Sequence, residues 1–234
     1  MKFFKLDYSL DKKIIGRAEG EKSCLFDGYR FKEDSFSNQG LFGPVVGNPA
    51  LPMPIMHKSV KMTDFIGLVA MLPEYLIITK KFLDFLIPHF DTSYQTWKIS
   101  IKKGDVNYEY YILHLDYPKS DFINYDKSTF KLFEDLAAFQ YKDLDQEIKI
   151  TSDVDFLDKC REFPGLYGIP ELQSTKIVLN TSNQEVDFFR CAHNGMAGYY
   201  VSERLKEAIL ENGFTGMRFE EIEEIQNRVV IEYV

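Results

Sequence analysis

An apolar run, a hydroxyl side chain and a charged pair follow one another in Tyr75-Leu76-Ile77-Ile78-Thr79-Lys80-Lys81-Phe82. The apolar run has the length of a short buried strand, and Thr79 is a favourable N-cap residue. Beyond it, Phe82, Phe85 and Leu86 recur at helical spacing until Pro88, which cannot continue a helix. The stretch therefore predicts a strand that passes directly into a short helix.

The same order of residue types returns 123 positions later in Val201-Ser202-Glu203-Arg204-Leu205. Leu205, Ala208 and Ile209 then form an apolar stripe, and Gly213 stands where a helix end favours a left-handed residue. Two interpretations are open: an internal repeat, or a common way of starting a helix that occurs twice by chance. A single pair of matching segments favours chance, because repeat folds normally show several copies.

A β-hairpin is predicted from Thr96 to Leu115, because Trp97, Ile99 and Ile101 alternate with polar residues and Lys103-Gly104-Asp105 supplies a turn. Further strands are expected at Phe3–Tyr8, Lys176–Leu179, Val186–Cys191, Phe214–Ile222 and Val229–Val234, and further helices from Ser152 to about Phe163 and from Glu203 to Asn212. Since strands and helices do not alternate regularly, we predict an α+β fold with a mixed or largely antiparallel sheet and a few short helices.

The segment Asn38–Pro54 is rich in proline and glycine and is predicted to be a loop. Its glycines do not form a phosphate-binding loop, because no Gly-Lys-Ser/Thr ending follows them. We therefore divide the chain into residues 1–54, an N-terminal segment with a Pro/Gly-rich connector, and residues 55–234, an α+β domain.

The composition is typical of a compact globular protein. Hydrophobic residues make up 45% of the 234 residues, which allows a sizeable core and excludes global disorder. A formal net charge of -8 argues against a dedicated nucleic-acid binder and favours basic partners. The N-terminal residues lack an apolar signal segment, and the apolar run Phe65–Pro73 is too short to span a membrane. We therefore predict no membrane partner. Three widely spaced cysteines, Cys24, Cys160 and Cys191, predict reduced thiols in a cytoplasmic protein.

Catalytic and metal-binding motifs are sparse in this chain. His57, His89, His114 and His193 form none of the spacings that place metal ligands on one face, so we predict neither a metal nor another cofactor. Period-2 spacing allows Cys191 and His193 to form a thiolate–imidazole pair with Asp187 as the orienting group. A small cytosolic hydrolase that uses this pair is the alternative hypothesis. Against it, nucleophile and base normally come from different parts of a fold.

The C-terminal end of the sequence is acidic. From Glu203 to Val234, eight Glu face four Lys or Arg, so half of the net charge lies in the last 32 residues. Such a patch steers basic partners. Within it, Glu220, Glu221, Glu223 and Glu224 are the candidate partner-binding residues. In a strand, Glu221 and Glu223 share one face and Glu220, Ile222 and Glu224 the other, so a buried Ile222 would leave Glu221 and Glu223 as the exposed pair.

Three C-terminal motifs resemble a family of bacterial immunity proteins from polymorphic toxin systems: Asp187-Phe188-Phe189-Arg190, Tyr200-Val201-Ser202-Glu203-Arg204-Leu205, and Gly213-Phe214-Thr215-Gly216-Met217-Arg218-Phe219. Upstream segments are similar to earlier parts of the family, namely Ile78–Phe82, Tyr111–Leu113 and Ile123–Ser128. The resemblance thus extends over about residues 75–219. It implies an immunity-type α+β domain in residues 55–234 that is not an enzyme. The implied function is a cytoplasmic antidote that binds a cognate toxin and blocks its surface.

Overall fold

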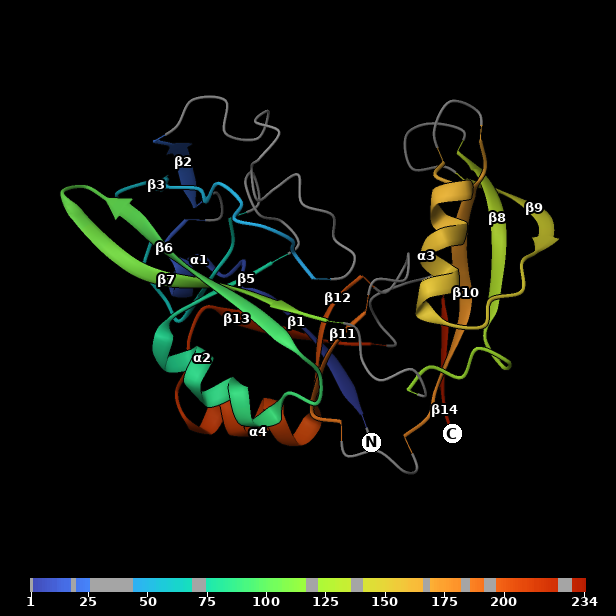
Figure 1. Ribbon diagram of the computed structural model, residues 1–234. Helices are drawn as coiled ribbons and strands as arrows, with labels where there is room; N and C mark the ends of the chain where they lie inside the picture. The colour runs from blue at the N-terminus through green and yellow to red at the C-terminus, as the bar shows by residue number, and fades with distance from the viewer. Residues whose placement is uncertain are drawn as a thin grey trace.

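The computed structural model describes residues 2–17, 20–25, 44–68, 75–116, 122–135, 141–165, 169–181, 186–191, 197–222 and 229–234. Three sheets organise these residues (Figure 1). Strand makes up 46% and helix 19% of the structure. The predicted α+β class with mixed and antiparallel sheets is therefore confirmed, but the fold is richer in strand than the sequence reading implied.

The first sheet has six strands in the order β2-β3-β6-β7-β5-β4. Its long hairpin of β6 and β7 pairs residue by residue from Tyr94 to Leu115, which confirms the predicted hairpin. Helix α2 follows β5 directly, and the short 3-10 helix η3 extends it. The elements are β2 (Glu21–Cys24), β3 (Pro54–Met56), β4 (Phe65–Ile66), β5 (Leu76–Ile78), α2 (Lys80–Leu86), η3 (Ile87–His89), β6 (Tyr94–Lys103) and β7 (Val106–Leu115).

The second sheet has four antiparallel strands in the order β11-β12-β1-β13, so the N-terminal strand lies between two strands from the C-terminal part of the chain. Helix α4 joins β12 to β13. A short helix, α1, follows β1. The elements are β1 (Phe3–Tyr8), α1 (Lys12–Ile15), β11 (Phe188–Cys191), β12 (Gly198–Ser202), α4 (Glu203–Glu211) and β13 (Met217–Glu221).

The third sheet has the order β14-β10-β8-β9 and packs against helix α3, as the right side of Figure 1 shows. Its members are β8 (Thr129–Asp135), β9 (Tyr141–Glu147), α3 (Asp153–Glu162), β10 (Glu171–Leu179) and β14 (Val230–Tyr233). Ser152 caps α3 and Phe163 ends it, as the sequence predicts. The strand β14 runs parallel to β10, whereas the other pairs of this sheet are antiparallel.

The loop and domain predictions concern the N-terminal part of the chain. Of the predicted loop Asn38–Pro54, residues 38–43 lie outside the described residues, residues 44–53 contain no helix or strand, and Pro54 begins β3. The division of the chain at residue 54 stays a prediction. The structure adds that β1 belongs to the second sheet and that β2 pairs with β3.

An internal repeat connects the first two sheets. Residues 64–98 and 187–221 correspond at a constant offset of 123 residues, with matching strand registers. Phe65 faces Ile78 as Phe188 faces Val201, and Thr79 and Ser202 cap the helices that follow. The sequence reading favoured chance for this similarity. That preference was wrong, because the correspondence includes pairing and connectivity and not only the five-residue segment.

The fourth strand of the second copy comes from the other end of the chain. The strand order β4-β5-β7-β6 in the first copy matches β11-β12-β1-β13 in the second, all antiparallel. Strand β1 thus occupies the position of β7. In the first copy a tight turn at Gly104 joins β6 to β7. In the second, the equivalent hairpin is open, and the Ile222 amide donates to the Phe3 carbonyl at 3.2 Å beside the opening.

The two copies share one hydrophobic core. It contains Phe82, Leu83 and Leu86 of α2 together with Leu205 and Ile209 of α4, and strand residues from both sheets. Figure 1 shows both helices on the same side of the molecule. The rings of Phe82 and Phe85 lie 4.7 and 4.9 Å from that of Phe214, which follows α4. Two separate cores cover the opposite faces of the two sheets.

A glycine pair offers a test of the contact between the two copies. Gly216 has φ +97°, and an added Cβ would lie 2.1 Å from the Phe65 carbonyl oxygen, whereas Gly213 has φ +70° and open space around it. We expect Gly213→Ala to lower the free energy of unfolding by about 1 kcal/mol through the left-handed backbone alone, and Gly216→Ala to cost roughly 2 kcal/mol more. Urea unfolding measures both variants. Equal losses would contradict a rigid contact at Gly216.

Candidate functional site

The predicted partner-binding carboxylates lie on β13, an edge strand of the second sheet. Glu220 and Glu221 are partly exposed, and each already has a cation from its own chain. Glu220 Oε1 lies 2.6 Å from Arg218 Nη1, and Glu221 Oε2 lies 2.9 Å from Lys2 Nζ. Ion pairs at this exposure contribute about 0–1 kcal/mol, so an incoming partner can exchange them at small cost.

The alternation places Glu220 and Glu221 on opposite faces as predicted, but the Glu221 face also carries the core residue Met217, so Glu221 is not singled out as the exposed one. Ile222 is 3% exposed and belongs to the core beneath the third sheet, which confirms that it faces inward. Glu221 shares the face of Met217 and Phe219, and Glu220 that of Arg218. Glu223 and Glu224 lie outside the described residues. The structure therefore places two of the four candidate residues, on opposite faces of one strand.

Asp187, which immediately precedes β11, has three side-chain partners among the described residues. Its carboxylate accepts hydrogen bonds from Ser202 Oγ at 2.6 Å and from Arg204 Nη2 and Nε at 2.7 and 3.2 Å. His89 Nδ1 lies 3.3 Å from its Oδ2. Ser202 and Arg204 belong to the same copy of the repeat as Asp187, whereas His89 ends η3 in the other copy. The carboxylate thus ties the two copies together.

The hydrogen bonds of Asp187 decide its charge state. Burial of the side chain opposes ionisation, but the hydrogen bonds from Arg204, Ser202 and His89 outweigh it and hold the pKa of the Asp187 carboxyl below its ordinary value. The same Ser202 hydroxyl accepts a hydrogen bond from the Leu205 amide at 3.2 Å and so caps α4, as the sequence predicts. Asp187 is an ionised structural carboxylate, fixed by a helix cap and an arginine.

Asp64 holds the equivalent position in the first copy. Its Oδ1 accepts a hydrogen bond from Thr79 Oγ1 at 3.1 Å. Its Oδ2 accepts hydrogen bonds from the amide and the hydroxyl of Thr215 at 3.0 and 3.2 Å. Thr215 follows α4 and therefore belongs to the second copy. Sequence reasoning missed both junctions. Asp64 and Asp187 stand at the offset of the repeat, and that signal could have paired them, but it does not identify His89 or Thr215 as partners.

The hydrolase hypothesis rested on Cys191, His193 and Asp187. The thiol of Cys191 lies in the core, 3% exposed, and His193 lies outside the described residues. Asp187, the predicted orienting group, is engaged by Ser202, Arg204 and His89. The structure therefore brings no two members of the hypothetical catalytic set into contact among the residues that it describes.

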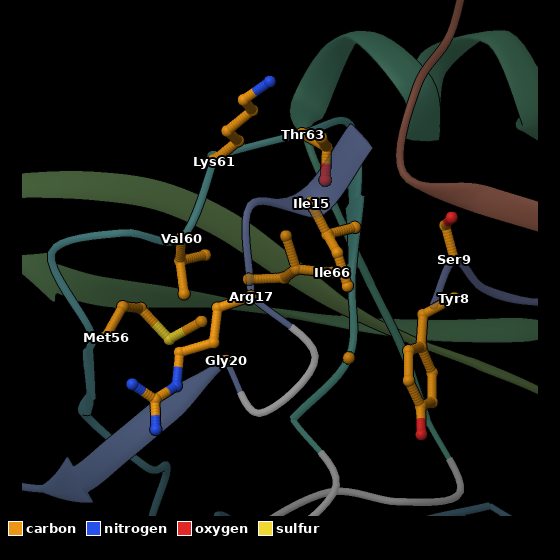
Figure 2. A pocket seen from close by; sticks show the side chains of 11 residues that line it. Tyr8, Ser9, Ile15, Arg17, Gly20, Met56, Val60, Lys61, Thr63 and Ile66 are labelled. Carbon is orange, nitrogen blue, oxygen red and sulfur yellow. The ribbon is translucent and has the colours of Figure 1, made fainter. Parts of the chain in front are cut away.

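A hollow of about 290 Å³, counting space open to solvent, lies between α1 and the first sheet. Ile15, Val60 and Ile66 form its apolar wall, and Figure 2 shows the Lys61 side chain pointing away from it. The Lys61 ammonium donates to the Lys13 carbonyl at 2.7 Å. Because this cation is held outside and the wall is apolar, we assign the hollow no ligand.

Metal and membrane features are absent from the described parts of the chain. Within these residues, no three His, Cys, Asp or Glu side chains are placed to hold a metal ion. None of the helices in the described ranges has the length and apolarity required to cross a membrane. Searches of known protein families and of curated proteins found no match to this sequence.

The depressed pKa of Asp187 makes the free energy of unfolding depend on pH. Its contribution is complete above the unfolded-state pKa of about 3.9 and is lost as the pH falls through the lower folded-state value. We expect Asp187→Asn to cost about 2–3 kcal/mol at pH 7, and the difference from the parent to shrink below about pH 4. Urea unfolding across this range measures it.

The matched control is Asp84→Asn, which removes an exposed i,i+4 pair with Lys80 on α2. It should change the free energy of unfolding by no more than about 0.5 kcal/mol at any pH. A pH-independent loss for Asp187→Asn, or a loss no larger than that of the control, would contradict the structural role of the Asp187 carboxylate.

Proposed function

We propose that this protein is a cytoplasmic immunity protein of a polymorphic toxin system, which neutralises a cognate toxin by occupying its surface. The observation that carries the proposal is the resemblance of the segments 187–190, 200–205 and 213–219 to that family. The proposal gains support from the contacts among these segments. The Asp187 carboxylate accepts hydrogen bonds from Ser202 and Arg204, so two of the three motifs are in direct contact.

The third motif also serves the scaffold. Gly213 and Gly216 adopt positive φ, Phe214 packs against α2, and Thr215 bonds Asp64 of the other copy. The three motifs therefore build the junction between the repeats. In the proposed function they define the scaffold, whereas the toxin is recognised by side chains on its surface. The proposal assigns no catalytic residue and no cofactor, and it gives Glu220, Glu221, Glu223 and Glu224 the partner-binding role.

A growth assay tests this function. The protein is co-expressed with the toxin encoded beside its gene, and growth is compared with cells that express the toxin alone. We expect rescue of growth and recovery of a stable complex in a pull-down. A toxin that kills equally well in the presence of the protein, and that does not bind it, would rule out the proposed function.

The acidic pair is tested by its effect on association with that toxin. Glu221→Lys/Glu223→Lys reverses two charges and also places a second ammonium next to Lys2, the present partner of Glu221. We expect the association rate constant to fall about tenfold at low salt and the difference to shrink as salt rises. Stopped-flow kinetics at two salt concentrations provide the measurement.

The control is Glu207→Lys/Glu211→Lys, which changes the charge by the same amount at two exposed positions of α4. Its association rate should stay within about twofold of the parent, because general electrostatic steering is weaker than a local contact. If both double variants slow association equally, the four glutamates act only through net charge and form no binding site.

A further inference from the structure

One described surface is basic, although the chain as a whole carries -8. It consists of α1 with its flanking residues and of the turn after β3. We call this surface the basic platform and define it by five exposed cations, Lys12, Lys13, Arg17, Lys58 and Lys61. The residues 10–17 and 57–61 contain one carboxylate, Asp11, so the platform carries a net charge of +4.

Backbone contacts hold the two halves of the platform together. The Lys61 amide donates to the Ile15 carbonyl at 2.8 Å, and its ammonium donates to the Lys13 carbonyl. A Cβ on Gly16 would lie 2.1 Å from the Ser59 carbonyl oxygen, so only glycine permits this approach. Such a surface offers its charges in a preformed arrangement, and association loses less conformational entropy.

Glu220 and Glu221 on the edge strand β13 form what we call the acidic edge. The platform differs from the acidic edge in how its charges are compensated. Lys12, Lys13, Lys58 and Lys61 form no ion pair with any described residue, whereas Glu220 and Glu221 are each paired. The carboxylate of Asp11 accepts the Lys13 amide at 2.8 Å and caps α1. These lysines therefore keep their charge for an external partner.

Two aliphatic side chains accompany these cations. Leu10 is 49% exposed and Ile14 is 38% exposed, and both flank Lys12 and Lys13 in the sequence. An apolar centre with a charged rim is the usual composition of a protein interface. We propose that the basic platform binds an acidic face of a partner protein, and that this partner is the toxin. The inference rests on the proposed function and adds a second, oppositely charged contact surface.

An acidic protein fits this surface better than a nucleic acid or a membrane. Four of the five cations are lysines, which lack the bidentate fork that arginine offers to phosphates. On α1 the platform cations alternate with aliphatic side chains, and the platform contains no Phe, Tyr or Trp on which bases stack. The net charge of -8 also repels an extended polyanion or an anionic bilayer, while a compact partner can approach the platform alone.

The platform and the carboxylates of β13 adjoin opposite ends of the β1–β13 ladder. Glu221 lies beside Phe4 at one end of the β1–β13 ladder, and α1 follows Tyr8 at the other. Four residue steps of about 3.3 Å separate Phe4 from Tyr8, or about 13 Å. An interface of standard size, about 800 Å² per partner, is wider than that. A toxin with both a basic and an acidic region is thereby oriented as well as attracted.

Two double variants test the platform. Lys12→Glu/Lys58→Glu reverses two platform charges, and Lys127→Glu/Lys149→Glu reverses two exposed lysines elsewhere. Glutamate at position 12 lies in the first turn of α1, where an acidic residue is favourable, so the fold should be retained. Circular dichroism checks this. Binding is measured with the neighbouring toxin and with three probes: poly-L-glutamate, duplex DNA and phosphatidylserine vesicles.

We expect the platform variant to bind the toxin and poly-L-glutamate about tenfold more weakly at low salt, and the control to stay within about twofold of the parent. Toxin binding that the platform variant leaves unchanged would overturn the inference while the proposed function stands. A toxin that does not bind the parent rules out the proposed function and the toxin as partner, and poly-L-glutamate then decides whether the platform binds acidic polypeptides. Tighter binding of DNA or vesicles than of poly-L-glutamate would also overturn the inference.

Discussion

Two carboxylates in equivalent positions, the buried Asp187 and the partly exposed Asp64, hold the two halves of this fold together. Asp64 and Asp187 each bond the hydroxyl that caps the helix of their own copy, and each is also contacted by the segment that follows the helix of the other copy, through Thr215 and His89. Each carboxylate therefore fixes a helix start and an inter-copy contact at once. At the buried Asp187, each of these hydrogen bonds offsets part of the cost of removing a carboxylate from water.

This reciprocal arrangement accounts for the position of β1. The two copies share one core, so each must present a complete four-stranded sheet to it, and the second copy obtains its missing strand from residues 3–8. No hairpin joins β13 to β1, whereas the equivalent strands β6 and β7 of the first copy are joined by one. The remaining C-terminal strand, β14, then pairs with β10, and the ring of Tyr233 lies 6.4 Å from that of Phe3.

The sequence predicted local features and missed distant ones, for a physical reason. Caps at Thr79, Ser152 and Ser202, the left-handed Gly213 and the β6–β7 hairpin depend on residues close in sequence. The insertion of β1 between β12 and β13 does not, and neither does the pairing of Lys2 with Glu221. The order of charges along the sequence therefore predicts the acidic stretch, but it does not show that Glu220 and Glu221 are paired with Arg218 and Lys2 of the same chain.

The distribution of polar groups separates scaffold from surface. The residues of the family-like motifs form the inter-copy junction, where Asp187 and Ser202 are almost inaccessible. A partner cannot touch these two side chains, so the proposed toxin contacts must come from exposed groups. Charge at exposed positions can change without disturbing the junction, because interactions at distant sites are nearly additive. A fold of this kind can retain Asp64 and Asp187 at its junction while the exposed charges of the basic platform and of β13 vary.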